Sequence, residues 1–199
     1  MNTLFSHVCV VTMDDRMSVW TDSFLGVTDG KISYLSKHAP EEKPDQIIDA
    51  TGMVLMPGLI NCHTHLPMQL LRGYADDLKL QEWLNDYIFP REDRLDGRCV
   101  RAATTLAVAE CLKFGVTSVS DMYYFCDDIC DVIAKSGMKA NISRGTSMFL
   151  GDDFDFEKFP ACQELVALKE KWHNYDNGRI KIEASIHAEY TSTYQLWDA

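Results

Sequence analysis

The sequence has few of the features that bring a chain to a membrane or to nucleic acid. Its longest apolar run, residues 53–62, is interrupted by Pro57 and Gly58 and is far shorter than the roughly 20 residues of a membrane-spanning helix. Lys and Arg number 19 against 30 Asp and Glu, a formal net charge of −11, and they are scattered along the chain. We therefore expect neither a membrane nor nucleic acid as a partner.

Export and disulfide signals are also missing. No basic segment followed by an apolar stretch opens the sequence, and we expect a cytoplasmic location. The seven cysteines have irregular spacings, which predicts reduced thiols. Cys126 and Cys130 have the spacing of half a metal site, but a second pair is lacking, so we interpret them as buried thiols.

The first part of the chain predicts a small β-rich domain. Apolar and β-branched residues gather in four short segments, 4–12, 19–28, 32–35 and 46–48, and Asp29-Gly30 marks a hairpin turn. These strands are too few to close a sandwich. Residues 1–55 are therefore expected to form an incomplete, partial β-sandwich that flanks the rest of the chain.

From residue 56 the pattern changes to strands that alternate with helices, which is typical of a parallel sheet. Asp96 is a plausible N-cap, and Gly115 and Gly137 each follow a helical segment. The predicted strands are 59–63, 116–121, 140–143 and 180–186, and the predicted helices are 97–114, 127–136 and 160–175.

With a fourth helix expected to start near Ala199, these are four strand-helix units, half of an eight-fold barrel, which typically needs about 250 residues. The expected fold class is thus α/β, with residues 56–199 as the N-terminal half of a (β/α)8 TIM-type barrel in a truncated sequence. The alternative is a complete four-stranded doubly wound domain. That fold normally has a glycine-rich phosphate loop after its first strand, where this sequence has His63-Thr64-His65, so we favour the half barrel.

Function gathers at the carboxyl ends of the strands in both folds, and here those ends are polar: they hold His63 and His65, Asp121, Arg144 and His187. Side chains two apart on a strand point to the same side, so both imidazoles of the first end can face one point. This arrangement predicts half of a metal site. Asp121 is interpreted as structural.

Several blocks of sequence resemble a known family. The most specific is Met-Pro-Gly-Leu-Ile-Asn-Cys-His-Thr-His at residues 56–65, followed by Met-Gln-Leu-Leu-Arg-Gly-Tyr-Ala-Asp-Asp at 68–77, Trp83-Leu84 and Pro90-Arg-Glu92. Together they resemble the amidohydrolase superfamily, in its 5-methylthioadenosine/S-adenosylhomocysteine deaminase branch, which is related to the chlorotriazine hydrolases. The resemblance covers the N-terminal half of a family member.

The resemblance implies a role for five residues. His63 and His65 would be ligands of one divalent metal, zinc in the first place and iron(II) as the alternative. Glu92 would contact ribose hydroxyls, and Arg144 and His187 would contact the substrate. Spacing alone also allows Glu92 to lie in a solvated charged loop and Arg144 to pair with an acidic neighbour. The remaining metal ligands and the acid/base carboxylate would lie outside this chain, so no catalytic residue is expected in this half.

The implied function is hydrolysis of carbon–nitrogen bonds other than peptide bonds, with an aminated purine nucleoside of the adenosine type as substrate. A second arginine expected after Arg144 has no counterpart, and residues 152–157 are acidic and aromatic, which predicts a preference for uncharged 5′ groups over S-adenosylhomocysteine. Two alternatives stay open: a triazine, guanine or amide hydrolase, and a non-catalytic binding or interaction fragment. The 199-residue chain alone is expected to be inactive and to self-associate or form a homo-oligomer.

Overall fold

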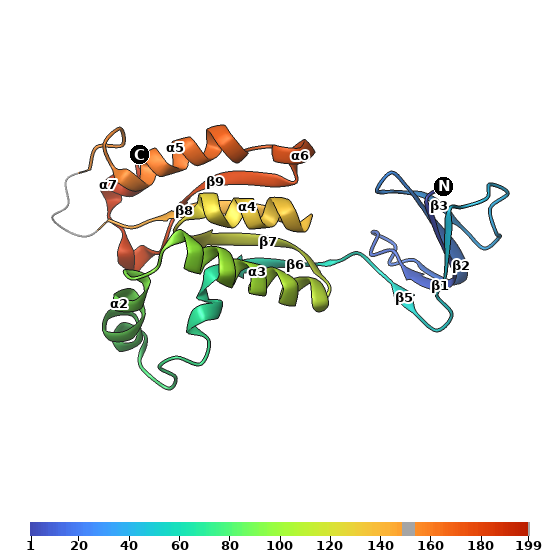
Figure 1. The fold of residues 1–199 in the computed structure, drawn as a ribbon, viewed down its shortest axis with the longest axis horizontal. Helices are drawn as coiled ribbons and strands as arrows, with labels where there is room; N and C mark the ends of the chain where they lie inside the picture. The colour runs from blue at the N-terminus through green and yellow to red at the C-terminus, as the bar shows by residue number, and fades with distance from the viewer. Residues whose placement is uncertain (149–153, 199) are drawn as a thin grey trace. The chain divides into compact units, whose positions relative to one another are not determined.

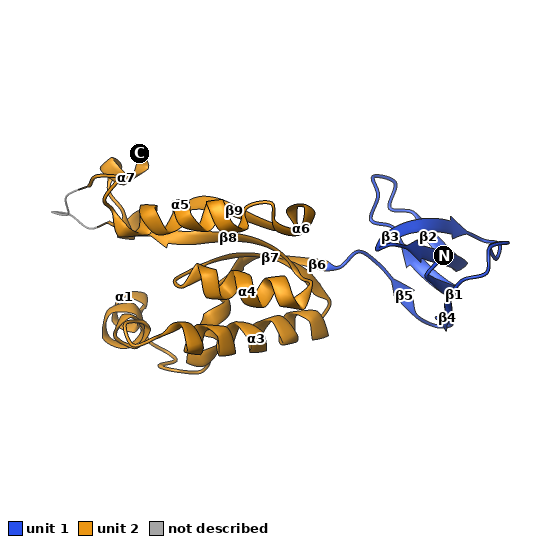
Figure 2. Ribbon diagram, turned by 45° about the horizontal axis from the view of Figure 1, so that its top comes forward, with its two compact units in different colours: residues 1–58 blue, residues 59–199 orange. Residues whose placement is uncertain are grey.

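The computed structural model describes residues 1–148 and 154–198, so part of the acidic stretch at 152–157 lies outside the described residues. The chain divides into two compact units, Met1–Gly58 and Leu59–Ala199 (Figure 2). In the described part of the chain, no helix combines the length and the apolar character needed to cross a membrane.

Unit 1 is a five-stranded sheet in the order β3-β2-β1-β4, with β5 also paired to β1. The two hairpins β1-β2 and β2-β3 are antiparallel, whereas β4 and β5 run parallel to β1. Asp29 and Gly30 both have positive φ, as a tight hairpin turn between β2 and β3 requires. The strands are β1 (Thr3–Val11), β2 (Val19–Thr28), β3 (Lys31–Ser36), β4 (Gln46–Asp49) and β5 (Val54–Leu55).

Unit 2 contains a parallel sheet in the order β6-β7-β8-β9, so that strands consecutive in the chain are neighbours in the sheet. This is the strand order of the first half of a (β/α)8 barrel, which confirms the predicted fold class. Figure 1 shows the long helices that connect the strands. The elements are β6 (Leu59–Thr64), α3 (Gly97–Lys113), β7 (Val116–Tyr123), α4 (Cys126–Ser136), β8 (Lys139–Thr146), α5 (Pro160–Trp172), α6 (Tyr175–Gly178) and β9 (Ile180–Ile186).

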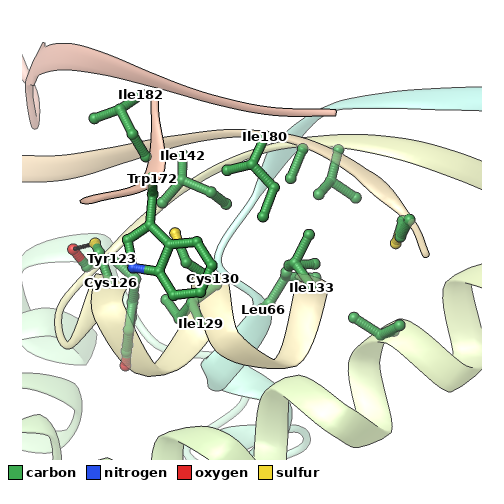
Figure 3. Close-up of a cluster of buried hydrophobic side chains, with 14 of the residues drawn as sticks. Leu66, Tyr123, Cys126, Ile129, Cys130, Ile133, Ile142, Trp172, Ile180 and Ile182 are labelled. Carbon is green, nitrogen blue, oxygen red and sulfur yellow. Dashed lines mark hydrogen bonds between the residues drawn. The ribbon is translucent and has the colours of Figure 1, made fainter. Parts of the chain in front are cut away.

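The core of unit 2 lies between the sheet and these helices (Figure 3). Ile129 and Ile133 of α4 are fully buried, as are Ile142 of β8 and Ile180 of β9. Burial of one such side chain stabilises a fold by roughly 1.5–3 kcal/mol. The core therefore holds the parallel sheet rigidly and fixes where its carboxyl ends lie.

Local signals place the ends of α3 and α4 within one residue of the sequence prediction. The Asp96 side chain accepts a hydrogen bond of 2.8 Å from the backbone N–H of Cys99 and so caps α3. Gly115 and Gly137 follow α3 and α4 with φ of +79° and +80°, a conformation that favours glycine. The predicted helix at 160–175 is too long, because Asn174 adopts a left-handed conformation and α5 ends at Trp172.

β7 and β8 run past their predicted ends, to Tyr123 and Thr146. Asp121, predicted as the last residue of its strand, and Arg144, predicted directly after its strand, therefore both lie within strands. The apolar pattern used for the prediction stops at these polar residues, whereas the hydrogen bonds between the strands continue beyond them. No helix is predicted for the short helical segments between β6 and α3 and after β9, namely η1 (Leu66–Leu71), α1 (Leu80–Glu82), η2 (Trp83–Ile88), α2 (Phe89–Glu92), η3 (Glu189–Thr191) and α7 (Tyr194–Trp197).

Candidate metal and substrate site

His63 and His65 lie together at the carboxyl end of β6. Their ring centroids are 5.3 Å apart and the rings are nearly perpendicular, at 82°. Thr64, between them, turns away and donates a hydrogen bond of 2.7 Å to the carboxylate of Asp121. The alternation expected from a strand thus puts the two imidazoles on the same side.

The ring of His65 is held in one tautomer. Its Nδ1 lies 2.6 Å from the carbonyl oxygen of Met122, and because a carbonyl can only accept, Nδ1 must carry the proton. The lone pair is then on Nε2. A backbone carbonyl bound to one ring nitrogen, with the other nitrogen free, is the usual arrangement of a metal-binding histidine.

Asp121 lies buried beside this strand end, with 1% of its surface exposed. One carboxylate oxygen accepts hydrogen bonds of 2.7 Å from the Thr64 hydroxyl and from the backbone N–H of Leu66. The other oxygen is buried and has no hydrogen-bond partner among the described residues. Burial raises the pKa of Asp121 to about 6, although both hydrogen bonds oppose the shift. Its two hydrogen bonds go to the residues on either side of His65, which agrees with a structural role.

Glu92 does not lie in a solvated loop. It ends α2 and is half-buried, and one of its carboxylate oxygens accepts a hydrogen bond of 2.6 Å from the hydroxyl of Tyr123. Burial raises the pKa of Glu92, and the hydrogen bond from Tyr123 opposes that rise. Pro90 precedes it by two residues and has no N–H to donate, which accounts for the wide π-helical turn of η2 just before α2.

His187 follows β9 and faces the same region. Its Nδ1 lies 2.8 Å from the hydroxyl of Thr191, which donates its own proton to the carbonyl of Ala188 at 3.2 Å. Nδ1 is therefore the donor, and Nε2 of His187 is free to accept. Burial, together with the nearby His65, lowers the pKa of His187, so the ring is neutral at pH 7.

These side chains line a pocket of about 170 Å³ at the carboxyl ends of the strands. His65, Glu92 and His187 supply its polar groups, and aromatic side chains including Trp83 and Tyr123 supply much of its wall. His63 is exposed beside the pocket and is not among its lining residues. Tyr123 was missed in the sequence because the predicted strand ended two residues too early.

Arg144 lines a second, larger pocket of about 730 Å³. The two pockets share Phe89, Glu92, Tyr124 and His187 among their lining residues, so they adjoin each other. The guanidinium of Arg144 lies 4.8 Å from the centre of the Tyr124 ring, and its Nε is 2.5 Å from a carboxylate oxygen of Glu164. Arg144 therefore lines the larger pocket and also has the acidic neighbour that spacing alone allowed.

The donor set fits part of a metal site. Two imidazoles face one side of β6, whereas a catalytic zinc usually has three protein ligands. In the part of the chain that the structure describes, no group of three or more His, Cys, Asp or Glu side chains is arranged to hold a metal. Cys126 and Cys130 are buried free thiols, as expected, and burial raises the pKa of Cys126 to about 12.

Several known proteins are similar to this chain in sequence. The chain is 35% identical over 193 residues to a 5-methylthioadenosine/S-adenosylhomocysteine deaminase of Acetivibrio thermocellus, a match that covers 96% of this chain and 44% of that protein. It is also 35% identical over 170 residues to a 5′-deoxyadenosine deaminase of Methanosphaera stadtmanae, covering 85% of this chain and 39% of that protein. The chain thus spans less than half the length of these relatives.

A solved structure agrees. The crystal structure of an adenosine deaminase from Xanthomonas campestris with bound zinc superimposes with a TM-score of 0.84 at 30% sequence identity, covering 96% of this chain and 44% of that one. Residues 54–198, which hold all five candidate site residues, match the model of the amidohydrolase family. This chain therefore belongs to the amidohydrolase family.

Proposed function

We propose that the complete protein is a metal-dependent hydrolase that deaminates adenosine-type nucleosides, and that this chain carries the N-terminal part of its site. The observation that supports this most is the convergence of His65, Glu92 and His187 on one aromatic-walled pocket at the carboxyl ends of the parallel strands. That is where barrel enzymes of this kind carry out their chemistry. The names of the relatives support the adenosine-type substrate.

His63 and His65 would hold one divalent metal, with zinc favoured by the zinc-bound neighbour and iron(II) as the alternative. When bound, such a metal would lower the pKa of a water molecule to about 7 and would so supply a hydroxide nucleophile at neutral pH. His65 would present its Nε2 to the metal, because its Nδ1 is hydrogen-bonded to the carbonyl oxygen of Met122.

Glu92 and His187 would hold the nucleoside. The Glu92 carboxylate accepts one hydrogen bond from Tyr123 and has further lone pairs for ribose hydroxyls. His187 presents a free Nε2, which can accept from a substrate N–H, and Trp83 offers an apolar aromatic wall for the purine ring. The remaining metal ligands and the acid/base carboxylate would come from later strands of the complete protein.

The test is ammonia release by the complete protein, loaded with zinc or with iron(II), from an adenosine-type nucleoside, guanine, an aminotriazine and a simple amide. We expect the highest kcat/KM for the nucleoside and loss of turnover after chelation of the metal. A higher kcat/KM for one of the other substrates would show that the protein has a different amidohydrolase activity. Absence of turnover with all four substrates would favour a binding role. We also propose a cytoplasmic location, which the seven free thiols support.

A further inference from the structure

The larger pocket extends the site beyond the ribose contact. Glu92 and His187 stand at its junction with the smaller pocket, which contains the metal-side residue His65. A nucleoside with its base near His65 and its ribose at Glu92 would therefore point its 5′ substituent into the larger pocket. This placement rests on the proposed function.

The guanidinium of Arg144 would be the obvious partner for an anionic 5′ substituent, but it is already engaged. Its Nε pairs with Glu164 of α5 at 2.5 Å, and another of its nitrogens donates to the carbonyl of Gly145. Its face covers the ring of Tyr124. The Arg144 side chain is 15% exposed and that of Glu164 is 56% exposed, so the guanidinium is sheltered and Glu164 offsets its charge from a more exposed position.

The other charges around the larger pocket do not restore an anion site. Among the residues that the structure describes, its lining includes four carboxylates, Glu92, Asp93, Asp127 and Glu164, but only two cations, Arg144 and Lys171. Lys171 is itself paired with Asp127 at 2.6 Å. Carboxylates thus exceed cations by two, and the potential in the pocket opposes the entry of a negative group.

We propose that Glu164 determines the specificity of the 5′ subsite by neutralising Arg144, so that the enzyme takes adenine nucleosides with a neutral or cationic 5′ substituent and rejects those with a 5′ carboxylate. Glu164 would act in two ways: it offsets the positive charge of Arg144, and its own negative charge repels a carboxylate. Rejection of the wrong substrate by an unfavourable charge is a common route to specificity.

The test compares two probes that differ in charge but hardly in shape, adenosine 5′-carboxylate and adenosine 5′-carboxamide. With the complete metal-loaded protein, we expect kcat/KM for the carboxamide to exceed that for the carboxylate by about tenfold or more, the fold-change that corresponds to ~1.4 kcal/mol. The Glu164→Gln variant should shift this ratio about tenfold toward the carboxylate. Glu170→Gln is the matched control, because it removes the same charge from α5 at an exposed position outside the pocket lining, and it should leave the ratio as it was.

A wild-type ratio near one, or equal shifts in the two variants, would overturn the role of Glu164. Turnover of the carboxamide tests the proposed function separately from the ratio. If neither probe is turned over, the proposed deamination fails, and calorimetric dissociation constants for the two probes still decide the charge preference. Tighter binding of the carboxylate to the wild type would then overturn the inference.

Discussion

The carboxylate of Asp121 in β7 accepts a hydrogen bond of 2.7 Å from the hydroxyl of Thr64, the residue between the two histidines of β6. The same oxygen accepts from the backbone N–H of Leu66, so one buried group fixes the chain on both sides of His65. The ring of His65 is in turn held by the carbonyl of Met122, the next residue along β7. The geometry of the histidine pair therefore depends on the neighbouring strand as well as on β6.

The buried carboxylate predicts a pH-dependent stability difference between the metal-free wild type and Asp121→Asn. The folded-state pKa of Asp121 is raised from 3.8 to about 6, so its stabilising contribution is complete below 3.8 and is lost as the pH rises through 6. Relative to the variant, the wild type should lose on the order of 3 kcal/mol of unfolding free energy between about pH 4 and pH 6. Urea unfolding at several pH values measures this, and a difference independent of pH would contradict the assignment.

Removal of the Tyr123 hydroxyl should change substrate binding and its pH dependence. Tyr123→Phe deletes the hydrogen bond that lowers the pKa of Glu92, so that pKa rises and the carboxylate forms at higher pH. We expect a higher KM for the nucleoside and an acidic limb of kcat/KM moved to higher pH. The control is Tyr34→Phe, which removes a hydroxyl in unit 1. An unmoved acidic limb would show that Glu92 does not govern this part of the profile.

Replacement of both strand-end histidines should remove the metal. In the complete protein, His63→Ala with His65→Ala deletes two of the proposed ligands, and we expect metal content by elemental analysis to fall from about one per site to a small fraction. Loss of a hydrogen-bond partner of a metal ligand alone typically costs about 10- to 100-fold in metal affinity, so loss of two ligands should cost more. His38→Ala in unit 1 is the control. Full metal content in the double variant would show that neither histidine is needed to bind the metal.

The 199-residue chain by itself should associate and should not deaminate nucleosides. Within the part of the chain that the structure describes, the strands β6 and β9 each pair with one neighbour, so each leaves an edge of unpaired backbone groups. Light scattering should report assemblies larger than a monomer, whereas a longer chain that supplies the missing strands should lose this tendency. Metal-dependent ammonia release by a monomeric 199-residue chain would contradict the half-barrel interpretation of the site.

The sequence by itself determined the features that depend on a few consecutive residues. The period of two in His63-Thr64-His65 predicts that both rings share one side of the strand, and the structure confirms it. Asp96 and Gly115 predict the ends of α3 because capping and left-handed turns are local events. The succession of strands and helices likewise predicts the parallel sheet.

Only the tertiary structure decided which distant side chains meet. Tyr123 reaches Glu92 across 31 residues of sequence, and Arg144 pairs with Glu164 of α5, which follows β8. Sequence spacing left Glu92 equally suited to a solvated loop, because no local period encodes the position of a helix against a strand. That position is set by packing of the helices on the sheet and by strand register, and these bring β7, β8 and α5 around one pocket.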